Sequence, residues 1–376
     1  MHDFLYLPTH KRADFQRLSI SAVLITGCLL LLSSCNSMSG TATTTANNVK
    51  SARVVLAAKV DASLRAQGLA QLETLQQWAA LMQQYNGNAS TYQQELISDQ
   101  QALRVAQTES AYQAVLQTLD QQVQSIKMLA LKNEATNQEH LLMQQADAWS
   151  QQHTYHDDYN NTTYHLGYEY GTNGVDGFVQ DELSSAHTLA DYQRAIEDAD
   201  MFLTSFQAYK TNVSDKTPWN QAHVTDLQLM QYYKTLNQKV VVVSLGEQVM
   251  RVYDNGKLVK AIKVTTGRPE KPSLPGAWQV EQKLSPTVFK SDEPVGSAYW
   301  YPNTPINYAM LYHSGGYFIH DSWWRADYGF GTQFPHADSS GDSFSFDGSH
   351  GCINVSKTEA AWLYNYVNVS TRVIVY

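Results

Sequence analysis

Residue usage changes abruptly near Leu236, and the two sides of this point require different folds. From about Ser51 to Tyr233 the chain is rich in glutamine, alanine and leucine and poor in proline. Beyond Leu236, β-branched residues become frequent, and eight of the ten prolines lie there. Such residues disfavour helix interiors and favour strands and turns. The sequence therefore predicts an α+β multidomain protein, with an all-α helical bundle at residues 51–235 and a β-rich domain at residues 236–376.

Apolar residues in the first region recur at steps of three and four. The clearest series are Leu72, Leu75, Ala79, Met82 and Tyr112, Leu116, Leu119, Val123, Ile126, Ala130. This spacing places each series on one face of a helix. Asn86-Gly87-Asn88 is a helix-breaking turn. We therefore expect a helical bundle or an antiparallel hairpin, with another helix at about Leu189 to Tyr209.

A polar segment between residues 152 and 177 interrupts the helical pattern. It contains side chains of the kind that bind metals: His153, His156, Asp157, Asp158 and His165. Their spacing matches no closed zinc motif, and polar loops often collect such residues. We therefore expect a loop here and no metal site.

The second region contains short strand patterns and one helix. Lys239 to Ser244 is an apolar strand, and Val249 to Tyr253 leads into the turn Asp254-Asn255-Gly256. An Asn-Gly pair between apolar runs is a strong hairpin signal. The other predicted elements are a strand at Leu258 to Thr265, a helix at about Lys357 to Val367, and a closing strand at Arg372 to Tyr376.

The N-terminus has the pattern of an export signal. Basic residues at positions 11, 12 and 17 precede a mostly apolar run from Leu18 to Leu32, which is short for a spanning helix. The run ends in Leu32-Ser33-Ser34-Cys35, which resembles the lipobox of bacterial lipoproteins. The resemblance implies a signal peptide at residues 1–35 and lipidation of Cys35. An uncleaved signal anchor is the alternative, and either arrangement places the protein outside the cytoplasm.

Residues 36–50 are mostly small and polar and read as a flexible tether from the membrane. The formal net charge of -9, without a basic stripe, argues against nucleic acid as a partner. Three cysteines are present, and Cys28 would be lost with the signal peptide. Cys352 then has no disulfide partner, and an unpaired cysteine in an exported protein is a candidate reactive thiol.

The residues around Cys352 are suited to acyl transfer. Ser349-His350-Gly351-Cys352-Ile353-Asn354 combines a thiol with a nearby imidazole that can take its proton. A glycine before the nucleophile allows close approach of a substrate. Backbone N–H groups beside Cys352, near the start of the following helix, could stabilise a tetrahedral oxyanion.

This hexapeptide resembles the signature of the L,D-transpeptidase (YkuD-type) catalytic domain. The resemblance covers residues 236 to 376. It includes the hairpin at residues 243–257, Thr266-Gly267-Arg268 with Leu274-Pro275-Gly276-Ala277-Trp278, and Gly315-Gly316-Tyr317-Phe318-Ile319-His320.

The resemblance implies a role for each matching residue. Cys352 would be the nucleophile and His320 its base, held by a neighbouring backbone carbonyl. His350 and Asn354 would organise the catalytic loop, which Ser349 and Gly351 would shape. The family joins peptidoglycan stem peptides through a thioester on the cysteine, with no metal or organic cofactor. The enzyme would therefore face the cell wall, anchored to the membrane by lipid.

Several alternatives remain open at this point. His320 lies 29 residues before Ser349, more than in many relatives, and residues 323–346 look like an insertion. His336, thirteen residues before Ser349, is the rival base, although His320 ends an apolar run that a strand would hold rigid. Tyr299, Trp300, Tyr301 and Tyr308 are candidates for the substrate groove or for ordinary core packing.

The exact reaction is also open. An L,D-carboxypeptidase or a wall-attachment enzyme would use the same thioester. A non-catalytic wall scaffold is the alternative that involves no enzyme activity. The helical region is expected to be a spacer between membrane and wall, or else a platform for a protein partner.

Overall fold

The computed structural model describes residues 60–376. The predicted signal peptide, the lipidation site Cys35 and the tether lie outside the described residues. Within residues 60–376, none of the helices is both long enough and apolar enough to cross a membrane.

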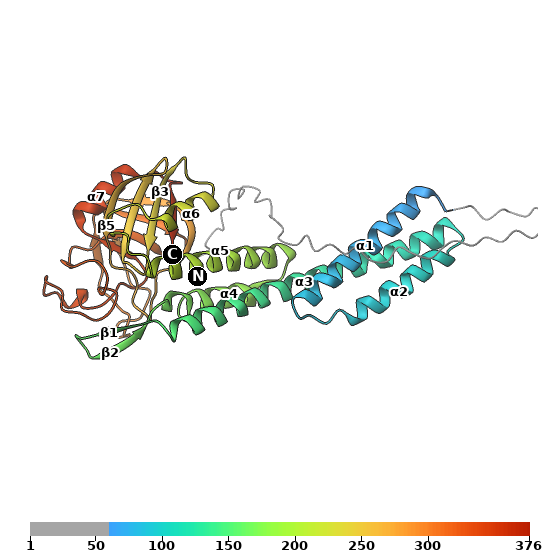
Figure 1. Cartoon of the computed structure of the whole chain (residues 1–376), viewed down its shortest axis with the longest axis horizontal. Helices are drawn as coiled ribbons and strands as arrows, with labels where there is room; N and C mark the ends of the chain where they lie inside the picture. Colours follow the sequence, from blue (N-terminus) through green and yellow to red (C-terminus); the bar gives the residue numbers. More distant parts are fainter. Residues whose placement is uncertain (1–59) are drawn as a thin grey trace, which may run out of the picture. The chain divides into compact units, whose positions relative to one another are not determined.

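The first part of the described chain is helical, as predicted (Figure 1). Helices α1 and α2 are separated by a turn in which Asn86 has a positive φ of 61°, which confirms the predicted break. The helices are α1 (Ala62–Gln84), α2 (Ser90–Val105), α3 (Glu109–Ser150), α4 (Val175–Ser185), α5 (Leu189–Val213) and α6 (Val224–Tyr232).

Helix α3 is the longest of the described helices, and its 42 residues give a length of about 63 Å. Its first half packs with α1 and α2 around a core that contains Leu75, Leu119 and Ile126. Its second half packs with α4 and α5 instead. The predicted apolar series is buried, because its spacing keeps one stripe of α3 against these partners.

The polar segment between α3 and α4 forms a hairpin where we expected a loop. Strands β1 (Thr154–Asp157) and β2 (Thr162–His165) pair in antiparallel fashion. Asn161 takes a positive φ of 55° in the turn between them. A short 3₁₀ helix, η1 (Tyr168–Tyr170), follows. The alternation in these strands is too short and too polar to stand out in the sequence.

The β-rich region is built on two sheets. The larger has the order β5-β4-β3-β13-β6, in which β13 is parallel to β3. The smaller has the order β12-β11-β10-β7, in which β11 and β12 are parallel. A separate hairpin joins β8 to β9.

The bounds of these strands agree closely with the sequence-based expectations. Strands β3 (Lys239–Ser244), β4 (Val249–Asp254), β5 (Lys257–Lys263) and β13 (Arg372–Val375) match four of them, and α7 (Lys357–Tyr366) matches the predicted helix. The remaining strands are β6 (Gly276–Gln279), β7 (Gln282–Leu284), β8 (Thr287–Phe289), β9 (Thr304–Ile306), β10 (Ala309–His313), β11 (Tyr317–Asp321) and β12 (Ile353–Val355). The Asn255-Gly256 turn has positive φ at both residues, as a tight hairpin requires.

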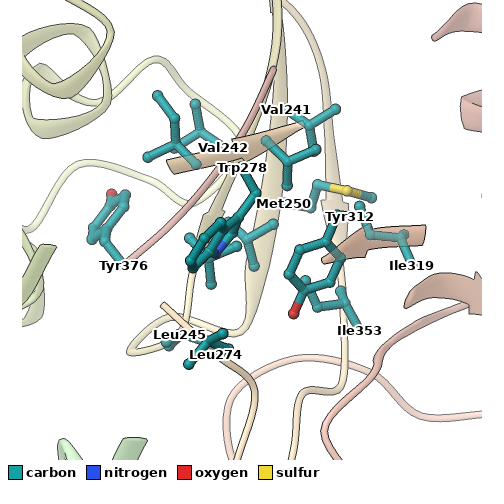
Figure 2. Packing of buried hydrophobic residues seen from close by; sticks show 14 of the residues in the cluster. Val241, Val242, Leu245, Met250, Leu274, Trp278, Tyr312, Ile319, Ile353 and Tyr376 are labelled. Atoms are coloured by element: carbon teal, nitrogen blue, oxygen red, sulfur yellow. The ribbon is translucent and has the colours of Figure 1, made fainter. Parts of the chain in front are cut away.

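One hydrophobic core joins the two sheets and the adjoining helices. Figure 2 shows Met250 of the larger sheet in one cluster with Ile319 and Ile353 of the smaller one. Phe202 and Phe206 of α5 belong to the same cluster. The chain is therefore a helical region followed by a β-rich domain, as predicted, but the core extends across the predicted boundary near residue 236.

Candidate active site

The parallel pairing of β11 and β12 brings His320 and Asn354 to one sheet face. His320 lies directly opposite Asn354, and Ile319 opposite Ile353. Cys352 directly precedes β12, two residues before Asn354, and its thiol lies against the Gly316 carbonyl just before β11. Ile319 and Ile353 point the other way, into the core.

The hydroxyl groups of Ser349 and Ser273 hold the loop before Cys352. The Ser349 hydroxyl donates to the Cys352 carbonyl and accepts a hydrogen bond from the Gly351 N–H at 3.1 Å. Ser273 donates to the Gly351 carbonyl at 2.7 Å. Gly351 has a φ of 106°, and a side chain there would meet the Tyr317 ring. These contacts fix the backbone of the loop on either side of Gly351.

The Cys352 thiol is partly exposed and is crowded by protein atoms. Its S–H donates to the Gly316 carbonyl at 3.7 Å. Burial raises the pKa of Cys352 to about 11, and the Phe318 backbone N–H opposes this rise. Cys352 keeps some contact with solvent. The protein atoms around its sulfur nevertheless disfavour the charged thiolate, which is why its pKa is raised. The resting thiol is therefore protonated at neutral pH, so a base must take its proton before or during attack.

His320 is buried, with 4% of its surface exposed, and both ring nitrogens are engaged. Nδ1 lies 2.9 Å from the Asp321 carbonyl, a neighbouring backbone carbonyl of the kind that the resemblance implies. Nε2 lies 3.0 Å from the amide nitrogen of Asn354. Burial lowers the pKa of His320 to about 4. Within residues 60–376, no imidazole nitrogen is hydrogen-bonded to the Cys352 sulfur, although apo active sites often tighten such contacts only with substrate bound.

His350, the imidazole closest to Cys352 in sequence, is engaged elsewhere. Its Nε2 accepts a hydrogen bond from Arg268 at 2.8 Å. Crowding by the protein, together with the cations Arg268 and Lys271, lowers the pKa of His350 to about 4. The two cations oppose protonation of this ring, so His350 is poorly suited to accept a thiol proton. Its organising role stays a prediction.

The rival base His336 lies in the insertion, residues 323–346. Its Nδ1 lies 2.7 Å from the Phe334 carbonyl, and its Nε2 faces Asp338 at 3.8 Å. Neither strand β11 nor β12 carries it. Its described partners all belong to the insertion, whereas the partner of His320 is the motif residue Asn354.

Tyr308, one of the candidate groove residues, lies against helix α7. Its ring packs against Tyr364 of α7 at 5.4 Å, and its N–H donates to Asp321. These contacts are those of a packing residue. The tyrosines whose pKa values are raised in part by Cys352, after burial, are Tyr301, Tyr312 and Tyr317. Tyr299 instead lies against the cations Arg268 and Lys271.

Helix α7 begins at Lys357, as predicted, with Ser356 as its N-cap, and strand β12 lies between it and Cys352. The role of backbone N–H groups beside Cys352 as oxyanion donors stays a prediction. Backbone N–H groups of the loop and of β11 remain as donors, since the Phe318 N–H reaches the thiol.

One buried residue of the site was missed from the sequence. Arg325 of the insertion donates from Nε to the Asn354 side-chain oxygen at 3.1 Å. It stands 29 residues before Asn354, so only the fold brings the two together. No periodic pattern could have indicated this contact.

The polar hairpin residues that resembled metal ligands serve the local structure. His153 stacks on Trp149 at 3.9 Å, and His165 lies 2.8 Å from the Ser150 carbonyl. His156 lies 3.2 Å from the Thr163 hydroxyl. In the part of the chain that the structure describes, no group of three or more His, Cys, Asp or Glu residues could hold a metal ion.

The fold and the hexapeptide together define a class of domain. Residues 238–375 match the family model of the L,D-transpeptidase catalytic domain, YkuD. The C-terminal region of this chain is therefore an L,D-transpeptidase catalytic domain of YkuD type.

The relatives are L,D-transpeptidases at low identity. L,D-transpeptidase 2 of Mycobacterium tuberculosis is 26% identical over 142 residues, 37% of this chain and 31% of that protein. L,D-transpeptidase 1 of the same species is 25% identical over 155 residues, 40% of this chain and 56% of that protein. A crystal structure of an Enterococcus faecium L,D-transpeptidase mutant has 29% identity and a TM-score of 0.31, covering 37% of this chain and 50% of that one. The chain thus spans 31% and 56% of the length of these two curated relatives.

Proposed function

We propose that this chain is an L,D-transpeptidase that forms peptidoglycan cross-links through a thioester on Cys352. The observation that carries the proposal is the β11–β12 register, which pairs His320 with Asn354, two residues after Cys352. The match of residues 238–375 to the family model supports the substrate class, peptidoglycan stem peptides.

The first half-reaction is acylation by a donor tetrapeptide stem. The Cys352 sulfur attacks the carbonyl carbon of the third residue while His320 accepts the thiol proton. The tetrahedral intermediate then collapses, the bond to D-alanine breaks, and His320 returns the proton to the departing amine. The products are a thioester on Cys352 and free D-alanine.

The second half-reaction transfers the acyl group to an amine. The side-chain amine of an acceptor stem attacks the thioester, His320 accepts its proton, and the Cys352 thiol is regenerated. The new amide joins the third residues of two stems. Both steps use the same nucleophile and base, so the reaction follows ping-pong kinetics.

The pKa values of the pair indicate how the proton moves. The pKa of Cys352 is raised by burial and the pKa of His320 is lowered by burial, so both groups are neutral at pH 7. A preformed thiolate–imidazolium pair is disfavoured in this environment. Proton transfer therefore accompanies the attack on the carbonyl, as in general-base catalysis.

The test is turnover of a purified disaccharide-tetrapeptide, followed by liquid chromatography and mass spectrometry. We expect free D-alanine and a cross-linked dimer, both absent with Cys352→Ala and strongly reduced with His320→Gln. His336→Gln is the matched control for loss of an imidazole and should retain turnover. A larger defect in His336→Gln than in His320→Gln would reassign the base.

The same products separate the other functions. D-alanine and tripeptide without any dimer would indicate an L,D-carboxypeptidase. Transfer to a protein amine, seen as a peptide–protein conjugate, would indicate a wall-attachment enzyme. No D-alanine release from a folded wild-type protein would leave a non-catalytic scaffold.

We also propose attachment to a membrane through lipid on Cys35. The support is the basic, apolar and Leu-Ser-Ser-Cys pattern of residues 11–35. Metabolic labelling with an alkyne fatty acid should mark the wild-type protein and leave Cys35→Ala unmarked. Equal labelling of both proteins would overturn this proposal.

A further inference from the structure

Arg325 is a buried cation without an ion-pair partner. Only 7% of its surface is exposed. Within residues 60–376, no carboxylate lies at ion-pair distance from its guanidinium. Its acceptors are neutral oxygens: the Asn354 side chain at 3.1 Å, the Ser345 carbonyl at 3.0 Å and the Asp347 carbonyl at 2.5 Å. Burying a charge in this way is costly, so such a residue is a candidate for a functional role.

The chemistry of arginine determines the orientation of the Asn354 amide. A guanidinium has donors only, so it must face the amide oxygen of Asn354. The amide nitrogen of Asn354 then faces His320 Nε2 at 3.0 Å. Because that nitrogen is a donor, His320 Nε2 must present its lone pair. The ring proton is consequently on Nδ1, where it donates to the Asp321 carbonyl.

We propose that Arg325 is a positioning residue that acts through Asn354 to hold His320 in the tautomer with its lone pair on Nε2. This inference rests on the proposed function, in which that lone pair leaves the Asn354 N–H when it takes the Cys352 proton. An imidazolium would put an N–H against the Asn354 amide N–H, and Arg325 prevents the amide from turning over to accept it. The proton taken from the thiol is thus readily passed to the leaving amine.

A purely structural role for Arg325 is the competing explanation. Its two backbone contacts tie the insertion to the segment before the catalytic loop. Asp338 is anchored in the same insertion: its carboxylate accepts from the N–H groups of Ala326 at 3.0 Å and Asp327 at 3.1 Å. Asp338 is not hydrogen-bonded to Asn354 or His320 in the described residues. It therefore offers a matched control for loosening the insertion alone.

The test combines nitrogen-15 NMR of histidine-labelled protein with the rate of Cys352 acylation by imipenem, for wild type, Arg325→Met, Arg325→Lys and Asp338→Asn. In Arg325→Met we expect loss of the Nδ1-protonated signature of His320 and a rate about 10- to 100-fold lower, the equivalent of one charge-assisted hydrogen bond. Arg325→Lys should recover part of the rate. Asp338→Asn should lower the melting temperature and leave both the tautomer and the acylation rate at wild-type values.

The pH profile of acylation gives a second signature. The charged groups around His320 are Asp321 on its own strand and Arg325 from the insertion, and the rings of Phe289 and Trp324 cover it. Arg325 contributes to the lowered pKa of His320, so its removal should move the acidic limb of the profile to higher pH. Asp338→Asn should not move this limb.

The outcomes separate the two proposals. A wild-type rate and spectrum in Arg325→Met would overturn the positioning role, as would equal changes in Arg325→Met and Asp338→Asn. Absence of acylation in the wild type would overturn the proposed function, while the NMR signature of His320 would still decide the role of Arg325.

Discussion

The two ends of the helical region differ in what they pack against. The distal end, which we define as α1, α2 and the first half of α3, surrounds a core of its own. The proximal end, which we define as the second half of α3 with α4, α5 and α6, contributes to the core that contains both β-sheets. The domain boundary predicted near residue 236 marks the change in amino-acid composition. The boundary between the two main hydrophobic cores instead lies about halfway along α3.

The proximal end also reaches the segments that shape the active site. The Tyr168 hydroxyl donates to the Gly267 carbonyl at 2.7 Å, and Asn173 donates to the Pro269 carbonyl at 3.3 Å. Phe334 of the insertion stacks on both Tyr155 and Tyr164 of the hairpin. The proximal end therefore contacts the catalytic domain directly, whereas the role of the helical region as a spacer or a partner platform stays a prediction. Changes at the two ends should thus have different consequences.

The largest effect is expected in the buried ionic cluster that joins α6 to the larger sheet. The Asp226 carboxylate accepts from Arg251 Nε at 2.6 Å and from the hydroxyls of Tyr253 and Tyr376 at 2.6 Å. Asp226→Ala leaves a fully buried guanidinium short of a partner, which costs about 3–5 kcal/mol. Urea unfolding followed by circular dichroism measures this loss. Arg194→Ala, in an exposed pair with Asp191, is the control and should cost about 1 kcal/mol or less.

A pair of core truncations contrasts the two ends directly. Phe206→Ala in the shared core should cost about 3–5 kcal/mol and should lower the concentration of urea at which Cys352 loses acylation by imipenem. Leu119→Ala in the distal core should cost about 2–5 kcal/mol, with no change in that acylation midpoint. Loss of acylation at the same lower urea concentration in both variants would show that the ends unfold as one unit.

Glu169 gives the proximal end a distinct pH dependence. Burial raises the pKa of Glu169 from 4.5 to about 7. Between these values the folded chain binds more protons than the unfolded chain, so stability falls as the pH rises, and the loss is complete above pH 7. The shift corresponds to about 3 kcal/mol. Glu169→Gln should therefore stabilise the protein more at pH 8 than at pH 5 in urea unfolding. An equal effect at both pH values would refute this dependence.

The smallest effect concerns the contact of Tyr168 with the loop beside the nucleophile. Tyr168→Phe leaves the buried Gly267 carbonyl without this donor, which costs about 1–3 kcal/mol. We expect slower acylation of Cys352, because Gly267 and Ser349 are bridged in the catalytic loop. Tyr159→Phe, at the exposed tip of the hairpin, should change neither stability nor rate. Indistinguishable rates for the two variants would separate the hairpin from catalysis.

Local patterns predicted much of the fold. The run Lys239–Ser244 is apolar on both faces because helices cover one side of the sheet and β-strands the other, and its strand was predicted at its observed bounds. The Asn255-Gly256 turn and helix α7 carry equally local signals. The hexapeptide around Cys352 indicated the nucleophile for the same reason: its chemistry lies within six neighbouring residues.

Long-range contacts could not be predicted in this way. The partner of Asn354 is Arg325, which belongs to an irregular insertion. The support of that insertion by Tyr155 and Tyr164 depends on a hairpin in a segment that reads as a polar loop. Tyr308, a candidate for the groove or for core packing, has its ring against Tyr364 of α7, 56 residues further along the chain, and no local pattern indicates this contact.

The most direct measurement is peptide mapping by mass spectrometry after the full chain reacts with imipenem, whose strained ring acylates a reactive thiol. A single adduct on the peptide that contains Cys352, forming much more slowly in His320→Gln and absent in Cys352→Ala, is the predicted result. An adduct on another residue, or an unmodified Cys352 in a folded protein, would contradict the assignment of Cys352 as the nucleophile.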